Sequence, residues 1–259
     1  MTDLDDAYAN VPNIPGGAQY PARWAVAAEV FRTRARAELG LPYGDSPRQA
    51  FDLFHPEGTS RGLCVFVHGG FWLRFDRSLW SHLAAGPLAR GWAVAMPSYD
   101  LCPEVRISDI TRQIAQAIMV AGARIAGPIA LTGHSAGGHL AARMAVPGVL
   151  ASEVAARLSH ILPISPVADL RPMLRTSMND KFGLDTAAAE AESPVLMRPL
   201  PVPVTVWVGG AELPAFLDQA RWLSQAWGAP LEIAQGCHHF DVIEALADPA
   251  SAMVASLIV

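Results

Sequence analysis

Five consecutive residues, Gly133 to Gly137, carry the clearest chemical signal in the sequence. They read Gly-His-Ser-Ala-Gly and match the pattern G-x-S-x-G, in which the serine is a candidate nucleophile. An apolar run precedes the motif and a helical pattern follows it, which is the strand-turn-helix context that a nucleophile requires. The small residues Gly133, Ala136 and Gly137 let strand and helix pass closely around a strained serine. The pattern predicts attack by Ser135 on a carbonyl carbon; a glycine-rich turn without chemistry is the alternative.

A second motif follows an earlier apolar run and reads His68-Gly69-Gly70-Phe71-Trp72. A glycine-rich loop in this place supplies a backbone N–H to an oxyanion hole, because a substrate oxygen can approach a backbone that carries no side chain. We expect the donors to be Gly70 or Phe71, together with Ala136. Phe71 and Trp72 are expected to wall a substrate pocket, and His68 is expected to support the loop.

The general base is expected after the last strand, where two histidines, His238 and His239, stand side by side. The chemistry of the two residues does not separate them, so both remain candidates. Adjacent side chains point in different directions and no HExxH pattern is present, which argues against a metal site. Cys237 is expected to be a packing residue, because no separate base is available to it.

The acid that orients the histidine is expected between the serine and the histidine, at the end of a strand. Glu212 follows the apolar run PVTVWVG and is the first candidate. Asp169 also follows a strand end and is the second. An acid in the first turn of a helix, favoured there by the helix dipole, is the alternative role for Glu212.

The elements that must position these groups alternate between short apolar runs and helical patterns, which predicts an α/β fold with a mostly parallel sheet covered on both faces. Strands are predicted at residues 51–54, 63–68, 92–97, 128–133, 160–165, 203–209 and 231–235. Helices are predicted at 108–126, capped by Ser108, in the last segment after Asp241, and over residues 20–39. The first 45 residues otherwise carry little strand signal, and residues 169–199 form a mixed polar insertion.

Composition narrows the classes of partner. The chain has 259 residues, a formal net charge of −5 and scattered basic residues, so a nucleic-acid partner is not expected. No apolar run reaches membrane-spanning length, and the acidic N-terminus does not resemble a secretory signal, which predicts a cytoplasmic protein. Three cysteines without metal-like spacing predict reduced thiols.

The segments HGGFW, GHSAGGHL, VGGAELPAF and HHFDVIEAL occur in this order. In this the chain resembles the α/β-hydrolases of the kynurenine formamidase (arylformamidase) type, which are related to the hormone-sensitive-lipase-like esterases. The resemblance implies Ser135 as nucleophile, His239 as base, Glu212 as acid, and Gly69, Gly70 and Phe71 as the oxyanion loop. The chain departs from the family where Glu212 replaces the commoner aspartate and where Phe71 replaces a third glycine found in many esterases.

The resemblance implies a single α/β-hydrolase domain over residues 1–259, with residues 1–50 as an N-terminal extension and residues 169–199, approximately, as a lid-like insertion. The predicted function is a metal-independent, cofactor-free serine hydrolase that cleaves small carboxylic esters or aryl formamides such as N-formylkynurenine through an acyl-enzyme. The alternatives are a general short-chain carboxylesterase and a non-catalytic ligand-binding protein of the same fold. The expected partner is a small-molecule ester or amide, and association into a homo-oligomer stays open.

Overall fold

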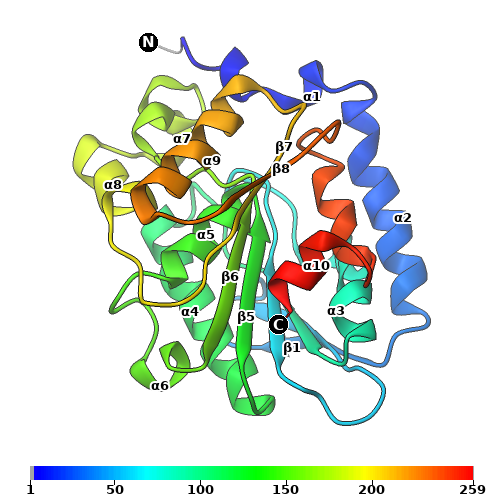
Figure 1. Cartoon of the computed structure of the whole chain (residues 1–259). Helices are drawn as coiled ribbons and strands as arrows, with labels where there is room; N and C mark the ends of the chain where they lie inside the picture. The colour runs from blue at the N-terminus through cyan, green and yellow to red at the C-terminus, as the bar shows by residue number, and fades with distance from the viewer. Residues whose placement is uncertain (1–2, 259) are drawn as a thin grey trace.

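One eight-stranded sheet runs through the molecule (Figure 1), in a computed structural model that describes residues 3–258. Its order is β1-β2-β4-β3-β5-β6-β7-β8. All neighbouring pairs are parallel except β1 with β2 and β2 with β4. The strands are β1 Ala37–Pro42, β2 Ala50–Phe54, β3 Leu63–Val67, β4 Ala93–Pro97, β5 Ile129–His134, β6 Leu158–Ile164, β7 Val206–Gly209 and β8 Leu231–Ala234.

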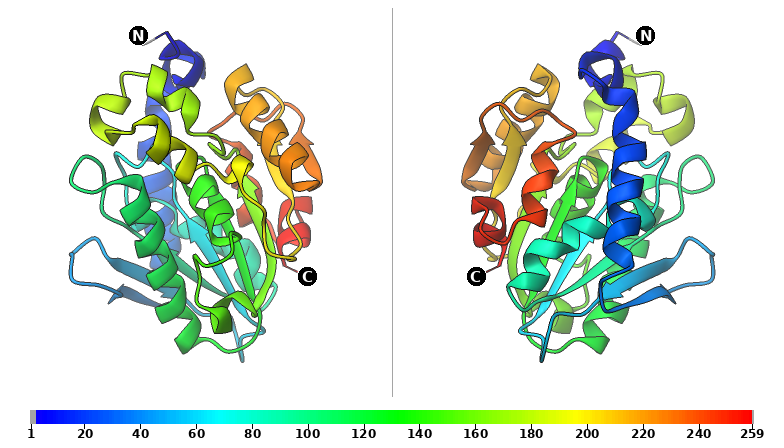
Figure 2. Two further views of the ribbon diagram at one scale, coloured as in Figure 1. Left: turned by 90° about the vertical axis from the view of Figure 1, so that its left-hand side faces the viewer. Right: turned by 90° about the vertical axis from the view of Figure 1, so that its right-hand side faces the viewer.

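Helices cover both faces of this sheet: in Figure 2 the green helix α4 lies in front of the sheet in the left view, and the blue helix α2 lies in front of it in the right view. Alternate residues of β3 separate the two cores: Leu63 and Val65 pack with α4 and α5, whereas Cys64 and Phe66 pack with α2 and α10. The α/β class with a mostly parallel sheet is therefore confirmed. The helices are α1 Asn10–Asn13, α2 Tyr20–Arg32, α3 Ala85–Ala89, α4 Ile107–Arg124, α5 Ala136–Met144, α6 Ser152–Ala155, α7 Asn179–Phe182, α8 Thr186–Ala191, α9 Pro214–Trp227 and α10 Ala252–Leu257.

The N-terminal region differs from the sequence prediction. The helix predicted over residues 20–39 ends at Arg32, and the chain then forms the edge strand β1, which the sequence analysis missed. Most β1 residues are exposed, so the strand lacks the alternating apolar pattern that would predict it. The strand forms instead by pairing with β2, and the register of this pairing shifts between Glu38 and Leu41. Within the shift, the Gly40 N–H donates to Asp52 Oδ1 at 2.8 Å.

Two other helix predictions need correction at their ends. The long helix α4 begins at Ile107, and Arg106 rather than Ser108 occupies its N-cap position. The single helix predicted after Asp241 is divided into a 3-10 helix, Val242–Ala247, and α10. The break falls at Asp248 and Pro249, because proline lacks the N–H that a continuous helix needs.

Residues 169–199 form a series of short helices, including α7 and α8, that pack beside the carboxyl end of the sheet (Figure 1). A buried ion pair fixes this insertion to α5: Arg143 Nε donates to Glu192 Oε2 at 3.0 Å, and both side chains are almost entirely buried. The Thr111 hydroxyl donates to the same carboxylate at 2.7 Å. These contacts hold the insertion against α4 and α5.

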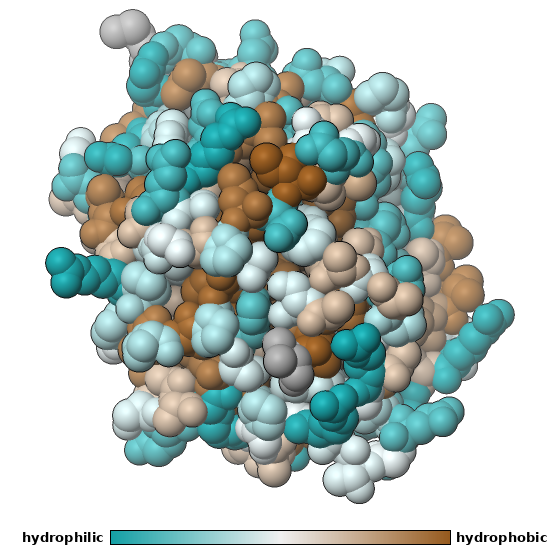
Figure 3. All heavy atoms as spheres, viewed as in Figure 1, coloured by the Kyte–Doolittle hydropathy of each residue, from teal (hydrophilic) through white to brown (hydrophobic). Residues whose placement is uncertain are grey.

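Within residues 3–258, no helix is long and apolar enough to cross a bilayer. On the face shown in Figure 3, polar and apolar residues are interspersed.

Gly137, at the start of α5, lies so close to β3 that the fold depends on its lack of a side chain. A Cβ there would stand 1.9 Å from the carbonyl oxygen of Val67. We therefore expect Gly137→Ala to lower the free energy of unfolding by about 3 kcal/mol, since neither backbone can move independently. Urea denaturation would measure it. Gly122→Ala, in the last turn of α4 with contacts no closer than 3.4 Å, is the control and should be neutral or stabilising.

Candidate active site

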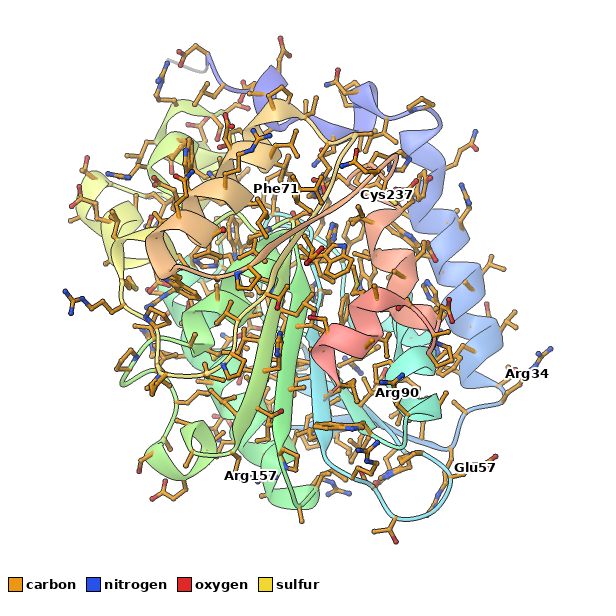
Figure 4. The ribbon with its side chains drawn as sticks, in the orientation of Figure 1. Arg34, Glu57, Phe71, Arg90, Arg157 and Cys237 are labelled. Carbon is orange, nitrogen blue, oxygen red and sulfur yellow. The ribbon has the colours of Figure 1, made fainter. Side chains whose placement is uncertain are left out.

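The two glycine-rich motifs meet at the carboxyl ends of adjacent parallel strands, β3 and β5, where Val67 pairs with Gly133. In the sheet, β4 lies on one side of β3 and β5 lies on the other, so the direction in which strands are added reverses here. Open α/β sheets bind ligands at such a switch point. Figure 4 shows Phe71 near this end of the sheet, with Arg157 at the opposite end.

Ser135 occupies the turn between β5 and α5 in a strained backbone conformation. Its φ of 59° and ψ of −116° lie outside the regions that non-glycine residues favour. Its N–H donates to the Ile164 carbonyl at 2.9 Å, which fixes the turn against β6. The residue is 3% exposed and lines a cavity at this end of the sheet. Such strain is typical of a nucleophile that a sharp turn presents to substrate.

The loop after β3 is strained as well. Gly70, Phe71 and Trp72 have φ values of 112°, 53° and 56°, an unusual run in which two residues are not glycine. Gly70 and Phe71 line the cavity, as expected of an oxyanion loop. Gly69 lies against the end of β5: a Cβ atom added to it would be 2.7 Å from the His134 carbonyl oxygen.

Trp72 does not wall this cavity, which corrects the prediction from the sequence. Its side chain is fully buried and makes edge contacts with the rings of His139 and Phe182 at 5.1 and 5.6 Å. The turn of the backbone at Trp72 directs the indole toward the core. Trp24 and Trp80, from other elements, provide the indole rings of the cavity instead.

His239 and Glu212 form a buried pair at the same end of the sheet as Ser135. The Nδ1 atom of His239 lies 2.5 Å from Glu212 Oε2, and the two residues are 2% and 7% exposed. Glu212 follows β7, and His239 follows β8, so neighbouring strands bring them together. His239 and Ser135 line the same cavity. The centroid of the Phe216 ring lies 4.1 Å from the centroid of the His239 imidazole.

Ser165 is a site residue that the sequence analysis missed. Its hydroxyl donates to Glu212 Oε1, which also accepts the Gly209 N–H at 2.8 Å. These two donors hold the carboxylate so that its other oxygen faces His239. Ser165 itself has a positive φ of 46°. The only signal in the sequence was a polar residue at the end of the predicted strand 160–165.

The second candidate for the acid, Asp169, lies elsewhere. Its carboxylate accepts from Arg171 Nη2 at 2.6 Å and from the Arg171 backbone N–H at 3.0 Å. Asp169 lines a separate surface hollow that also includes Trp222. The structure therefore brings Glu212, and not Asp169, to the histidine.

His238 also has its own partners. Its Nδ1 accepts backbone N–H groups from Phe240 and Asp241 at 3.2 and 3.3 Å, and its Nε2 lies 3.1 Å from the Tyr20 hydroxyl. His238 thus connects the loop after β8 to α2.

We expect His238→Ala to keep most of its kcat, since these contacts are structural, while losing about 1–2 kcal/mol of stability. His239→Ala should lose several orders of magnitude in kcat. Ester hydrolysis and thermal unfolding of both variants would test the difference, and equal losses of kcat would contradict the assignment.

The cavity over Ser135 has a volume of about 580 Å³, which suits a small-molecule ligand. Aromatic rings form much of its wall, among them Trp24, Phe71, Phe75 and Phe240. The segment 5–21 provides more of the lining than any other segment, including Tyr8 and Asn10, and forms the roof of the cavity.

The roof corrects the expectation about the lid. The insertion 169–199 contributes only Ser177 and Met178 to the lining of this cavity. The two segments are joined, because Asp5 Oδ1 accepts the Ser177 N–H at 2.6 Å and Asp3 pairs with Arg175. The available signal in the sequence was a run that contains Pro12, Pro15, Gly16 and Gly17, which is typical of an irregular segment.

The other histidines near the loop are neutral structural groups. Burial, reinforced by the neighbouring His239 imidazole, holds the pKa of His134 well below its usual value. Burial also lowers the pKa of His68 to about 4. The His68 ring stacks on Tyr99 with centroids 4.3 Å apart, and its Nδ1 lies 2.7 Å from the Gly69 carbonyl oxygen. His68 therefore fixes the glycine loop.

No metal centre competes with this arrangement: among residues 3–258, no group of three or more His, Cys, Asp or Glu side chains is placed to hold a metal ion.

The sequence matches a known family. A family model described as the alpha/beta hydrolase fold matches residues 64–199, and the chain belongs to the α/β-hydrolase family. Kynurenine formamidase from Drosophila melanogaster is 32% identical over 228 residues, covering 79% of this chain and 75% of the fly protein. Kynurenine formamidase from Salmo salar is 27% identical and covers 84% of this chain and 79% of its own.

Solved structures agree on the fold. A crystal structure from Silicibacter sp. TM1040, of a protein with a provisional thioesterase assignment, is 61% identical, covers all of both chains and has a TM-score of 0.99. Esterase B from Lactobacillus rhamnosis has a TM-score of 0.65 at 20% identity and covers 87% of each chain.

Proposed function

We propose that the protein is a serine hydrolase that cleaves small esters or aryl formamides through an acyl-enzyme, with Ser135 as nucleophile, His239 as base and Glu212 as acid. One observation carries the proposal: Ser135 and a histidine paired with a buried carboxylate line the same aromatic cavity. The family and the formamidase relatives support the same class of reaction.

The mechanism follows from the roles of these groups. His239 takes the proton of Ser135 Oγ while the oxygen attacks the substrate carbonyl, and Glu212 stabilises the imidazolium that forms. The N–H groups of Ala136 and of Gly70 or Phe71 stabilise the oxyanion of the tetrahedral intermediate. His239 then gives its proton to the leaving group, and water releases the acyl group by the reverse sequence. No metal or cofactor takes part in these steps.

The cavity favours an aromatic substrate with a small acyl group. The Phe216 ring packs on the His239 imidazole, with centroids 4.1 Å apart, and lies 6.3 Å from the Phe71 ring, so we expect a small acyl group such as formyl or acetyl on this side. The rings of Trp24, Phe75 and Phe240 suit an aryl leaving group. An aryl formamide such as N-formylkynurenine satisfies both requirements.

The test is steady-state hydrolysis of p-nitrophenyl acetate, N-formylkynurenine and a short-chain thioester, each with and without EDTA. We expect the ester and the formamide to be cleaved, with the higher kcat/KM for the formamide and no effect of EDTA. Cleavage of the ester alone would leave a general short-chain carboxylesterase. The thioester is included because the Silicibacter protein carries a thioesterase assignment.

A non-catalytic binding protein of the same fold is the alternative from another class. A purified protein that binds an aryl ligand, but turns over none of the three compounds and does not react with a serine-directed phosphonate, would support it. The cytoplasmic location and a homo-oligomeric state remain predictions.

A further inference from the structure

The imidazole of His134 packs against the imidazole of His239. The centroids of the two rings are 4.5 Å apart, and their planes are inclined at 45°. His134 is the last residue of β5, directly before Ser135, and it is 3% exposed. Its Nε2 atom is buried and has no hydrogen-bond partner in the part of the chain that the structure describes. The contact with His239 is therefore one of packed rings and not a hydrogen bond from this nitrogen.

The glycine loop after β3 makes room for the His134 ring. A Cβ atom added to Gly69 would lie 3.4 Å from His134 Nδ1 and 3.1 Å from Ser135 Cβ. Any side chain at position 69 would therefore press on the imidazole and on the serine together. One ring thus lies beside the proposed oxyanion loop, next to the proposed nucleophile in the chain, and against the proposed base.

Phe216 provides a second ring that contacts the same imidazole. The centroids of Phe216 and His239 are 4.1 Å apart, and the Phe216 ring is itself packed by Tyr8 and Phe71 at 5.6 and 6.3 Å. The carboxylate of Glu212 fixes only the Nδ1 atom of His239. Because the outer torsion of a histidine side chain has a broad energy minimum, one hydrogen bond leaves the ring able to tilt. Packed rings restrict that tilt.

His134 suits a place beside the base because it stays uncharged. Burial, reinforced by the His239 imidazole, holds the pKa of His134 well below its usual value. The rings that contact His239 are uncharged and belong to His134, Phe216 and Phe240, while Glu212 supplies a negative charge. A positive charge on His134 would oppose the imidazolium that forms at His239 in the proposed reaction.

We propose that His134 is a positioning residue, which holds the His239 imidazole by ring packing so that Nδ1 stays on Glu212 and Nε2 stays available to the cavity. The inference rests on the proposed hydrolase function and deepens it, because it assigns a role to a residue outside the proposed triad. His134 gains and loses no proton in this role: the proton passes from Ser135 Oγ to His239 and then to the leaving group. Loss of the His134 ring slows the chemical step and leaves substrate binding unchanged.

Two replacements of His134 test the packing, each assayed below its melting temperature. His134→Ala removes the ring, and we expect kcat for p-nitrophenyl acetate to fall by about 10- to 100-fold, with KM within about threefold of the wild-type value. His134→Phe restores a ring without nitrogen atoms and should recover most of the lost kcat. If the larger phenyl ring lowers the melting temperature, the alanine variant decides the question.

A proton NMR signal gives a readout that does not depend on turnover. The proton between His239 Nδ1 and Glu212 Oε2, which are 2.5 Å apart, should give a low-field resonance in the wild-type protein. In His134→Ala we expect this resonance to broaden or to move upfield, because the imidazole can tilt away from the carboxylate.

His160→Ala is the matched control for both measurements. His160 is also a buried histidine, but it belongs to β6, and its Nε2 lies 3.1 Å from the Thr205 hydroxyl. This variant should lose stability while keeping the wild-type kcat and the low-field resonance.

The outcomes keep the two proposals apart. A His134→Ala protein with the wild-type kcat and resonance would overturn the positioning role, and so would a raised KM with unchanged kcat. A folded His134→Phe protein as slow as His134→Ala would overturn the role of ring packing. A wild-type protein that cleaves neither ester nor formamide would overturn the proposed function instead, and the resonance would still show whether His134 holds the His239 ring.

Discussion

Replacing Ser135 by alanine is expected to abolish hydrolysis, with a fall in kcat of about 10⁶-fold for esters and formamides alike. The proposed mechanism passes through a covalent bond to Ser135 Oγ, and the remaining histidine cannot form that bond. Steady-state assays with p-nitrophenyl acetate, together with mass spectrometry after treatment with a phosphonate, would measure both the rate and the loss of the labelled serine.

The fold of this variant is the necessary control. Ser135 is almost fully buried, and alanine is the closest residue without the hydroxyl, so the melting temperature should change little. A folded Ser135→Ala protein that retains wild-type kcat would show that another residue attacks the substrate.

The second large effect is expected at Glu212. Replacing it by glutamine keeps the size of the side chain but removes the negative charge that faces His239 Nδ1. We expect kcat to fall by about 10⁴-fold, because the imidazole is no longer held in the required tautomer and the imidazolium is no longer stabilised. Measurement of kcat and KM separately would show the loss in kcat.

Asp169→Asn is the matched control for Glu212→Gln. Both changes neutralise a buried carboxylate that follows a strand, but Asp169 pairs with Arg171 and lines a different hollow. This variant should keep most of its activity. A larger loss of kcat in Asp169→Asn than in Glu212→Gln would move the role of the acid to Asp169.

Ser165→Ala gives a smaller, related effect. The hydroxyl of Ser165 and the N–H of Gly209 share Glu212 Oε1, so removing the hydroxyl leaves the carboxylate with one donor fewer. We expect a fall in kcat of about tenfold, with KM unchanged, as for other residues that orient a ligand or a catalytic group. A change in KM alone would contradict this positioning role.

The sequence predicts the parts of the site that local pattern encodes. The strand-turn-helix context around Ser135 and the glycine loop at Gly69 and Gly70 have strong local signals, and the fold joins them at adjacent strand ends. The seven predicted strands correspond to β2 through β8. Only β1 was missed, because it forms by pairing with β2 and is mostly exposed.

Other parts depend on contacts between distant residues. His238 and His239 are neighbours in sequence, and only the direction of each side chain shows that one meets Glu212 and the other Tyr20. The roof is a similar case: Tyr8 reaches Gln219, far along the chain, and this contact joins the roof segment to α9. No local pattern encodes such a meeting.

The origin of the roof has a consequence for how this enzyme can change. Ser135, His239 and Glu212 follow strands of the central sheet, whereas much of the cavity that surrounds the substrate belongs to residues 5–21. We therefore expect mutations in that short segment to alter the choice of substrate while the proposed catalytic groups stay in place. Natural variation, or directed evolution restricted to residues 5–21, can therefore give activity on other acyl compounds while the proposed catalytic residues stay the same.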